Sequence, residues 1–482
     1  MRQFVVACAA GDGIGPEIMA AVRRILEAAG APIAWNDIVL GEKAYVAGHA
    51  SGVGPEAWDA IRGADAVLKG PLTTPQGGGY KSVNVTLRKS LGLYANVRPC
   101  VAYAPYVPTR HPGLDVVIVR ENEEDLYAGI EHRQTDDVVQ CLKLVTRTGC
   151  ERIVRHAFEH ARRNGRSKVT CMSKDNIMKL TDGLFHAVFD EIAAEYPDIA
   201  AEHMIIDIGA ARLADTPERF DVIVTGNLYG DILSDIAAQV AGSVGLAGSA
   251  NIGLHGALFE AVHGSAPDIA GKDIANPSGL LQAAVQMLVH LGLAGTASTI
   301  QNAWLRALEE GVRTPDIQGH AGAADPVGTA AFADAVIARL GRRPAALRPV
   351  SYAATPAAPT PAPAPESRPR ATKLLVGVDV FVHWRGADPA ELAARLSEAT
   401  GSGLTLSMIT NRGVKVWPGG LPETFCTDHW RCRFKADAAG GTTHRAVLAL
   451  LGGLEALGVD FIKTEQLYEF DGVPGFAVAQ GQ

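Results

Sequence analysis

The chain has 482 residues, more than one ordinary domain holds, so we expect two or three domains. Hydrophobic residues make up 47% and charged residues 20%, a composition typical of soluble globular proteins. The formal net charge of −8 argues against nucleic acid or an anionic membrane as a partner. No apolar run approaches the length that spans a bilayer.

The seven cysteines are odd in number and scattered along the chain, which suits reduced thiols. The apolar stretch before Gly11 is too short for a signal peptide and is typical of a first strand. Both observations favour a cytoplasmic protein.

The first predicted elements are a buried strand from Phe4 to Ala10, a glycine-rich turn and a helix to about Ala29. The glycines of the turn stand at 11, 13 and 15, with Pro16 next. This spacing does not match G-x-G-x-x-G, so we do not predict a Rossmann dinucleotide site here.

A second short strand, from Ala64 to Gly70, leads into a loop with threonines and glycines. Loops at strand ends are where α/β proteins hold ligands. Three arginines and two small polar residues follow within about 40 positions. Because guanidinium groups grip carboxylates with two hydrogen bonds, the cluster indicates a ligand with several carboxylates. These residues are Ser82, Asn84, Arg88, Arg98 and Arg120.

Strands then alternate with amphipathic helices, which predicts an α/β architecture. The predicted ranges are Val116–Val119, Glu151–Asn164, Lys168–Met172, Gly183–Glu195, Met204–Asp207, Asp221–Thr225 and Asp231–Ala241, and helices continue from Ser278 to about Leu340.

Residues 344–372 are rich in proline and alanine and are predicted to form an extended linker. After this linker, residues 373–482 alternate again in a β-α-β-β-α-β order, which indicates a small α+β domain. The predicted strands are Leu374–Val382, Leu404–Thr410, Arg431–Lys435 and Asp460–Tyr468, and the predicted helices are Pro389–Thr400 and Thr443–Leu457.

Asp231 and Asp235 stand four positions apart on a predicted helix, so their carboxylates share one face. Asp207 follows a different strand. Carboxylates without cysteine or histidine indicate Mg²⁺ or Mn²⁺ as the metal. Lys174, which follows an apolar strand, suits proton transfer, and Tyr127 is a candidate proton donor. Each of these residues alone is more often structural.

Taken together, the motifs resemble the metal-dependent β-decarboxylating dehydrogenases, the isocitrate and isopropylmalate dehydrogenase family. The resemblance covers residues 1 to about 343, through GDGIGPE, KGPLTT, RENEEDLYAGIE, KDNIMK, NLYGDILSD and HGSAPDIAGKDIANP. Ser82 and Asn84 resemble the isocitrate branch, where polar side chains meet a third carboxylate. Residues 373–482 resemble the extension of a subset of bacterial isocitrate dehydrogenases.

The resemblance implies a fold with a large domain (1–93 and 242–343), a small domain with a clasp (94–241), and a homodimer or higher oligomer with shared sites. It implies that the arginine cluster binds isocitrate, that Asp231 and Asp235 hold the metal with Asp207 of a second subunit, and that Lys174 and Tyr127 transfer protons. It assigns the nucleotide to Lys69, Thr73, Thr74, His263, Gly264, Ser265, Ala266, Asp268, Ile269 and Asn276.

The cofactor expected from the residues is NAD. NADP-preferring relatives carry Lys-Tyr where this chain has Asp268-Ile269, and a carboxylate repels the 2′-phosphate by about 1–4 kcal/mol at about 4 Å. Thr216 and Gly319–Ala323 replace other phosphate-binding residues, whereas Arg212 lies near the same edge and favours phosphate.

Several alternatives stay open at this point. One is an NADP-using isocitrate dehydrogenase, and another is a dehydrogenase of isopropylmalate, homoisocitrate or tartrate. A third is a non-catalytic regulatory subunit. The C-terminal domain is either an oligomerisation module or an effector-binding domain.

Overall fold

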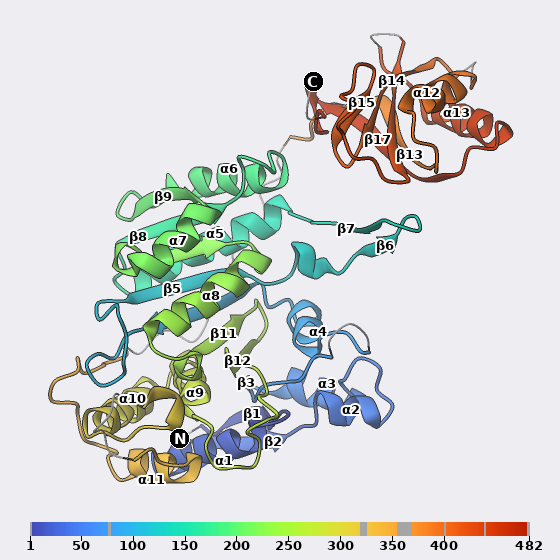
Figure 1. Cartoon of the computed structure of the whole chain (residues 1–482). Coiled ribbons are helices and arrows are strands. Elements are labelled where there is room, and N and C mark those ends of the chain that lie inside the picture. Colours follow the sequence, from blue (N-terminus) through green and yellow to red (C-terminus); the bar gives the residue numbers. More distant parts are fainter. Residues whose placement is uncertain are drawn as a thin grey trace. The chain divides into compact units, whose positions relative to one another are not determined.

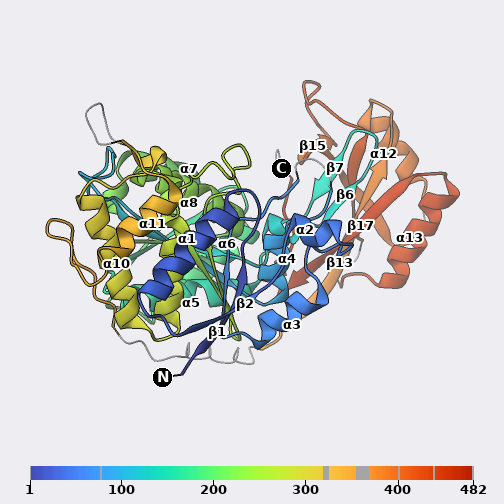
Figure 2. The ribbon, with the colours of Figure 1, turned by 90° about the horizontal axis from the view of Figure 1, so that it is seen from below.

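The computed structural model describes residues 2–75, 79–318, 325–353, 369–399, 402–437 and 440–479. They divide into two compact units (Figures 1 and 2). Unit 1 holds the described residues of 2–127, 144–177 and 181–353. Unit 2 holds Ala128–Lys143, Met178–Leu180 and the described residues from 369 onward.

The described residues of unit 1 form a ten-stranded sheet in the order β2-β1-β3-β12-β11-β4-β5-β10-β8-β9. The strands are β1 (Phe4–Ala9), β2 (Ile33–Asp37), β3 (Ala66–Lys69), β4 (Ala95–Val101), β5 (Asp115–Glu121), β8 (Lys168–Ser173), β9 (Ala200–Ile205), β10 (Val222–Thr225), β11 (Gly248–Ile252) and β12 (Ala257–Ala261). The pairs at both ends of the order are parallel, whereas β12-β11, β11-β4 and β4-β5 are antiparallel.

Helices cover both faces of this sheet. The helices are α1 (Gly15–Ala28), α2 (Glu42–Val46), α3 (Pro55–Gly63), α4 (Val83–Ser90), α5 (Arg147–Arg163), α6 (Thr181–Ala193), α7 (Ile206–Asp215), α8 (Asn227–Ala241), α9 (Ser278–His290), α10 (Ala294–Glu309) and α11 (Thr329–Ile337). Over β1, β3 and β12, α1, α9, α10 and α11 pack on one face and α3 and α4 on the other. Over β5, β8 and β10, α5 and α6 pack on one face and α7 and α8 on the other.

Helix α1 illustrates how the sequence produces these contacts. Pro16 occupies the first turn, where a missing N–H costs nothing, and apolar residues recur at helical spacing. Ile18, Val22 and Ile25 are fully buried against the core that α1 shares with α9 and α11. Figures 1 and 2 both show α1 beside α11.

The glycine-rich turn before α1 contacts a loop that lies about 250 positions later in the chain, at Ser265. Gly13 has φ +56°, and a Cβ there would lie 2.0 Å from the carbonyl oxygen of Ser265. The Ile14 N–H donates to that same oxygen at 2.9 Å. Glycine is therefore required for close packing against the loop after β12.

Unit 2 combines a hairpin with the C-terminal domain. The hairpin strands are β6 (Glu131–Arg133) and β7 (Val139–Cys141). The domain has an antiparallel sheet in the order β15-β14-β16-β13-β17-β18, with two helices packed on one face. Its elements are β13 (Lys373–His383), α12 (Pro389–Ser397), β14 (Leu404–Asn411), β15 (Val414–Trp417), β16 (His429–Ala436), α13 (His444–Ala456), β17 (Phe461–Phe470) and β18 (Val473–Pro474).

Within unit 2, hydrogen bonds join the hairpin to the C-terminal domain. Thr135 Oγ1 donates to Asp428 Oδ1 at 2.5 Å, and Arg385 donates to Asp136 Oδ2 at 2.5 Å. Thr135 is 6% exposed and Asp428 is half-buried, so the first of these contacts is partly shielded from water.

The predicted fold class, α/β with a small α+β C-terminal domain, is confirmed. Individual elements differ at their ends: the strand expected to reach Asp207 ends at Ile205, and Asp207 lies in the first turn of α7. Several strands were not predicted: β2, β4 and β11 of the large sheet, the hairpin strands β6 and β7, and the short strands β15 and β18. Among the described residues, no helix has both the length and the apolar character needed to cross a membrane.

Candidate active site

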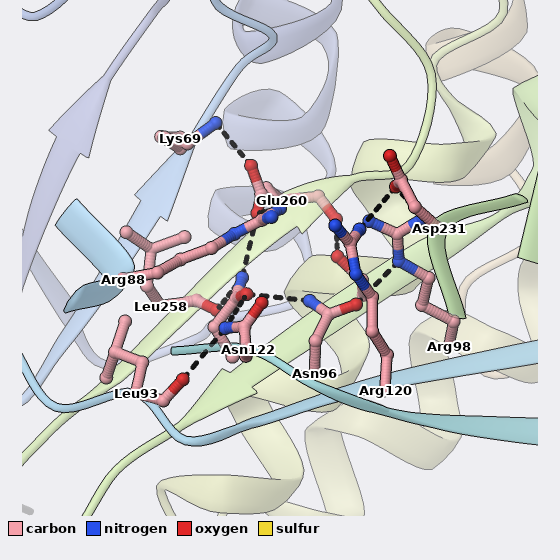
Figure 3. Close-up of polar contacts among 12 residues, drawn as sticks. Lys69, Arg88, Leu93, Asn96, Arg98, Arg120, Asn122, Asp231, Leu258 and Glu260 are labelled. Atoms are coloured by element: carbon pink, nitrogen blue, oxygen red, sulfur yellow. Dashed lines mark hydrogen bonds and ion pairs between the residues drawn. The ribbon is translucent and has the colours of Figure 1, made fainter. Parts of the chain in front are cut away.

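The three predicted arginines converge in unit 1 (Figure 3). Arg88 lies on α4, Arg98 on β4 and Arg120 on β5, and their exposed fractions are 7%, 4% and 1%. Strands β4 and β5 are antiparallel neighbours, which places Asn96 directly opposite Arg120. Such burial excludes a reading of these arginines as surface residues and requires that each guanidinium have partners.

Glu260 on β12 is the partner of Arg88. Its Oε1 accepts from Arg88 at 2.9 Å, and its Oε2 pairs with Lys69 (Figure 3). Burial alone would raise the pKa of Glu260, but Lys69 and Arg88 hold it far below its usual range. Lys69, predicted to bind the nucleotide, is itself 1% exposed, and burial lowers its pKa.

A row of asparagines orients Arg98. Its Nε donates to Asn96 Oδ1 at 2.5 Å, and Asn96 Nδ2 donates to Asn251 Oδ1 at 2.6 Å. Asn122 Nδ2 also donates to Asn251 Oδ1, and Asn251 donates to Glu260 at 2.8 Å. The network therefore connects Arg98 with the Glu260 pair through fully buried amides.

Asp231 receives two guanidiniums and a phenol. It accepts from Arg120, from Arg98 at 3.3 Å and, through Oδ2, from the Tyr127 hydroxyl at 2.5 Å. Burial would raise the pKa of Asp231, but Arg120 and Arg98 hold it below its usual value. Burial, and then the hydrogen bond to Asp231, raises the pKa of Tyr127. Tyr127 is thus protonated at neutral pH and able to donate.

Asn227, the first residue of α8, orients the Arg120 guanidinium through two hydrogen bonds. Its Oδ1 accepts from Arg120 Nε at 3.1 Å and from Arg120 Nη2 at 2.8 Å. Burial, with repulsion from Arg98 and Arg88, lowers the pKa of Arg120 to about 9. Crowding of like charges favours an anionic ligand at this place.

The three predicted metal ligands are not all brought together by one chain. Asp231 and Asp235, one turn apart on α8, both lie near Arg98, at 3.3 and 3.9 Å. Asp207 pairs instead with Lys174, whose Nζ donates to Oδ2 at 2.8 Å, and this bond lowers the pKa of Asp207. Among the described residues no contact joins this pair to Asp231.

The donor set nevertheless fits a divalent metal. The side chain of Asp235 is 66% exposed, and its pKa is raised by loss of hydration and, against the pull of Arg98, by the charge of Asp231. Two repelling carboxylates on one helix face are stabilised by a hard cation. Asp231 and Asp235 supply two carboxylates, whereas the third predicted ligand, Asp207, is paired with Lys174.

Another group of possible ligands, Asp175, His186 and His203, is poorly arranged for a metal. The two imidazole rings stack with centroids 3.5 Å apart and an interplanar angle of 14°. Because a ring nitrogen binds a metal in the plane of its ring, two nearly parallel rings do not aim at one point. His186 instead hydrogen bonds Asp175 at 2.7 Å.

Beside Arg88, the start of α4 presents the other predicted substrate ligands. Ser82 Oγ accepts from Thr74 Oγ1 at 3.3 Å, and Asn84 Oδ1 and Arg88 Nε are buried without a protein partner among the described residues. Thr73 Oγ1 lies 2.9 Å from Ser265 Oγ, so the loops after β3 and β12 meet.

The predicted nucleotide loop after β12 is partly open. His263, Ala266 and Ile269 are half-buried, Ser265 is 8% exposed, and Gly264 and Asp268 are exposed. Asn276 Nδ2 donates to Asp316 at 3.0 Å. Residues Gly319–Ala323, which entered the cofactor argument, lie outside the described residues.

A family model described as "Isocitrate/isopropylmalate dehydrogenase" matches residues 5–336. The chain belongs to this family. Residues 373–482 match the model of "Bacterial isocitrate dehydrogenase, C-terminal domain". The recognised family and its fold are thereby confirmed, including the C-terminal domain.

Some similar proteins match this chain over its whole length and others match only part of it. An "Isocitrate dehydrogenase [NADP]" of Rickettsia bellii is 52% identical over 483 residues and covers 100% of both chains. A Thermus thermophilus protein of known structure, TT0538, has a TM-score of 0.93 at 45% identity, covering 100% of this chain and 96% of that one. A "Probable isocitrate dehydrogenase [NAD] subunit alpha, mitochondrial" of Drosophila melanogaster is 46% identical over 312 residues, covering 64% of this chain and 82% of the relative.

Sequence reasoning missed the residues that hold the arginines in place. These are Asn96, Asn227, Ser234, Asn251 and Glu260. One signal was available: Glu260 is the single charge in the apolar run Ala257–Ala261, and a charge inside a buried strand needs a partner.

Proposed function

We propose that the protein oxidises isocitrate and removes a carboxylate from it, giving 2-oxoglutarate and CO₂. The observation that carries the proposal is the convergence of three buried guanidiniums beside Asp231 and Tyr127. A tricarboxylate matches this excess of positive charge better than a dicarboxylate with an apolar substituent. Membership of the family, and the printed names of relatives that share the whole chain, support the same reaction.

In this proposal the arginines and α4 bind the substrate. Arg98 and Arg120 hold carboxylates near Asp231, and Arg88 grips another from α4. The partnerless atoms Asn84 Oδ1 and Arg88 Nε are available for the substrate. Because each guanidinium is already fixed by a protein acceptor, little conformational entropy is lost on binding.

The residues that would hold a divalent metal are Asp231 and Asp235, with Asp207 from a second copy of the chain. The metal would supply Lewis-acid stabilisation of the alkoxide and of the enolate left after CO₂ departs. Sharing of the site implies a homodimer or a higher oligomer.

Proton transfers are assigned to Lys174 and Tyr127. Lys174 removes the proton from the substrate hydroxyl, acting from the second copy together with Asp207. Tyr127 delivers a proton to the carbon that lost CO₂, since its hydroxyl is protonated and directed at Asp231.

For the nucleotide we propose NADP in place of the NAD expected from the residues. The relatives that share nearly the whole chain are named for NADP, whereas two relatives named for NAD share only 312 residues with it. NAD is kept as a second candidate because Asp268 is exposed and makes no ion pair within the described residues, so its charge still opposes a 2′-phosphate.

The test is a set of initial rates on the chain purified alone, with Mn²⁺. We expect turnover of isocitrate and a higher kcat/KM with NADP than with NAD. Equal or better kcat/KM on isopropylmalate, homoisocitrate or tartrate would overturn the substrate, and absence of any turnover would favour a regulatory subunit. A higher kcat/KM with NAD would return the cofactor to the first expectation.

A further inference from the structure

Tyr127 is the last residue of its segment of unit 1. Residues 128–143 belong to unit 2, and unit 1 resumes at Leu144. The Tyr127 hydroxyl donates to Asp231 at 2.5 Å, and the Arg120 guanidinium lies 4.9 Å from the centre of its ring. These contacts hold the side chain. The backbone of Tyr127 needs an anchor as well, because a segment at the edge of a compact unit opens more easily than the core.

Asp125 supplies this anchor, two positions before Tyr127. It is 3% exposed, and its N–H donates to the carbonyl oxygen of Leu144 at 2.9 Å. Its Oδ2 accepts from the N–H of Leu228 at 2.9 Å. Leu228 is the second residue of α8, so the carboxylate of Asp125 makes the hydrogen bond that an N-cap side chain ordinarily makes.

Helix α8 has no capping side chain of its own. Its N-cap residue is Gly226, and its first turn contains no acidic residue. The carboxylate of Asp125 approaches Gly226 closely, since a Cβ there would lie 3.4 Å from Asp125 Oδ2. A negative charge at this end of a helix is also favoured by the helix dipole. Asp125 therefore caps the helix that carries Asp231, the acceptor of the Tyr127 hydroxyl.

The backbone of Asp125 is in the left-handed region, with φ +64°. Glycine adopts this region without cost, and aspartate and asparagine adopt it more readily than other residues with a side chain. A residue other than glycine in this conformation is a reason to look for a role of its side chain. The bond to Leu228 is a role that glycine could not fill.

We propose that Asp125 is a positioning residue for Tyr127. By binding the first turn of α8, it fixes the backbone next to Tyr127 relative to Asp231, which lies about one turn further along the same helix. Helix α8 packs against β5, the strand that leads into this segment (Figure 1). One rigid element thus places both the phenol and its acceptor. The inference rests on the proposed function, in which Tyr127 transfers a proton.

The test compares Asp125→Gly with Asp125→Asn in the full-length protein. Glycine keeps the left-handed backbone and removes the cap, whereas asparagine keeps both the backbone and an oxygen for the Leu228 N–H. One readout is kcat and KM for isocitrate with Mn²⁺ and NADP. The other is exchange of the C3 hydrogens of 2-oxoglutarate with D₂O, which requires no oxidation. In this exchange the proton passes from C3 to the Tyr127 oxygen, its electron pair moves into the C2 carbonyl, and a deuteron returns by the reverse path.

Asp125→Gly should lower kcat and the exchange rate about 10- to 100-fold, because a small misplacement of a reacting group has effects of this size. Its KM should stay within about threefold of the parent's, since the substrate-binding arginines are untouched. Asp125→Asn should stay within about threefold of the parent in kcat and exchange rate, because asparagine caps helices as well as aspartate does.

Two comparisons distinguish positioning from simple stabilisation of a helix. Asp388 caps α12 by accepting from the Ala390 N–H at 2.8 Å, so Asp388→Gly removes a matched cap in the C-terminal domain. It should leave kcat and the exchange rate unchanged. In a Tyr127→Phe background, Asp125→Gly should cause no further loss of kcat, since Asp125 acts through the Tyr127 hydroxyl.

Three results would each overturn the inference and leave the proposed function in place. They are an exchange rate of Asp125→Gly within about threefold of the parent's, an equal loss in Asp125→Asn, and an additive loss in the Tyr127→Phe background. A parent chain that does not turn over isocitrate would overturn both.

Discussion

The buried carboxylate of Glu260 offers the sharpest test of how the site is built. It is 3% exposed and neutralises two cations, Lys69 and Arg88, that are themselves 1% and 7% exposed. Replacing it by glutamine keeps the shape but leaves both cations without a counter-charge. Removing one member of a buried ion pair costs about 3–5 kcal/mol, most of it the burden of the uncompensated charge.

That magnitude decides the assay. Two units are present, so a single unfolding midpoint is not a safe measure, and local hydrogen exchange of β3 and β12 is preferable. At about 1.4 kcal/mol per tenfold change, a cost of about 3–5 kcal/mol means that Glu260→Gln should lower protection of these strands by about 10²- to 4 × 10³-fold. We also expect a raised KM for isocitrate, because Arg88 loses the acceptor that orients it.

The pH dependence follows from the depressed pKa of Glu260. A carboxyl group with a lowered folded-state pKa stabilises the fold above its unfolded pKa, and loses that effect only as pH falls toward the folded value. The contribution of the carboxylate is therefore complete above about pH 6. Glu260→Gln also removes the charge that raises the pKa of Lys69 against burial, so the deficit should shrink at high pH as Lys69 loses its proton.

Two further variants complete the experiment. Asp37→Asn breaks the exposed pair with Arg23 and should change stability by about 0–1 kcal/mol. Adding Lys69→Met to Glu260→Gln restores the parent's net charge in the trio and should recover part of the lost protection. If the hydrogen-exchange protection of β3 and β12 is the same in Glu260→Gln as in the parent, the reasoning about Lys69, Arg88 and Glu260 is refuted.

Three other predictions concern different parts of unit 1. Tyr127→Phe should lower kcat about 10²- to 10⁴-fold with a small change in KM, because the hydroxyl acts as a proton donor; steady-state rates that match the parent would remove that role. Burial raises the pKa of Glu121 to about 7, so the fold should lose stability as pH rises from about 4.5 through 7. Glu121→Gln should flatten this slope, measured as the free energy of opening of β5 by hydrogen exchange at several pH values. Asp268→Lys with Ile269→Tyr should raise the kcat/KM ratio of NADP to NAD about tenfold or more, and an unchanged ratio would show that these positions do not meet the 2′-phosphate.

The sequence allowed prediction of the fold class and the positions of the arginines, because both depend on local patterns. The apolar run Val116–Val119 in β5 is short and bounded by polar residues, and Arg120 follows it directly. The sequence did not predict which side chains form ion pairs or hydrogen bonds with one another. Glu260 and Arg88 stand 172 positions apart, and only the order of strands in the sheet brings them together.

Composition also misled in one place. Proline and alanine in residues 344–372 predict a linker, yet residues 345–352 are hydrogen bonded to α10. The anchoring groups, Glu309, Asn302 and Ser298, belong to α10. The composition of residues 345–352 therefore does not predict these hydrogen bonds. The boundaries proposed for the large and small domains remain predictions.

The hairpin of unit 2 has one more consequence, for long-range mutational effects. It begins just after Tyr127, and Thr135 within it is bound by Asp428, 293 positions later in the chain. A substitution at Asp428 therefore acts on the segment that continues directly from the proposed proton donor. Variants at Asp428 should therefore be measured for turnover as well as for the stability of the C-terminal domain.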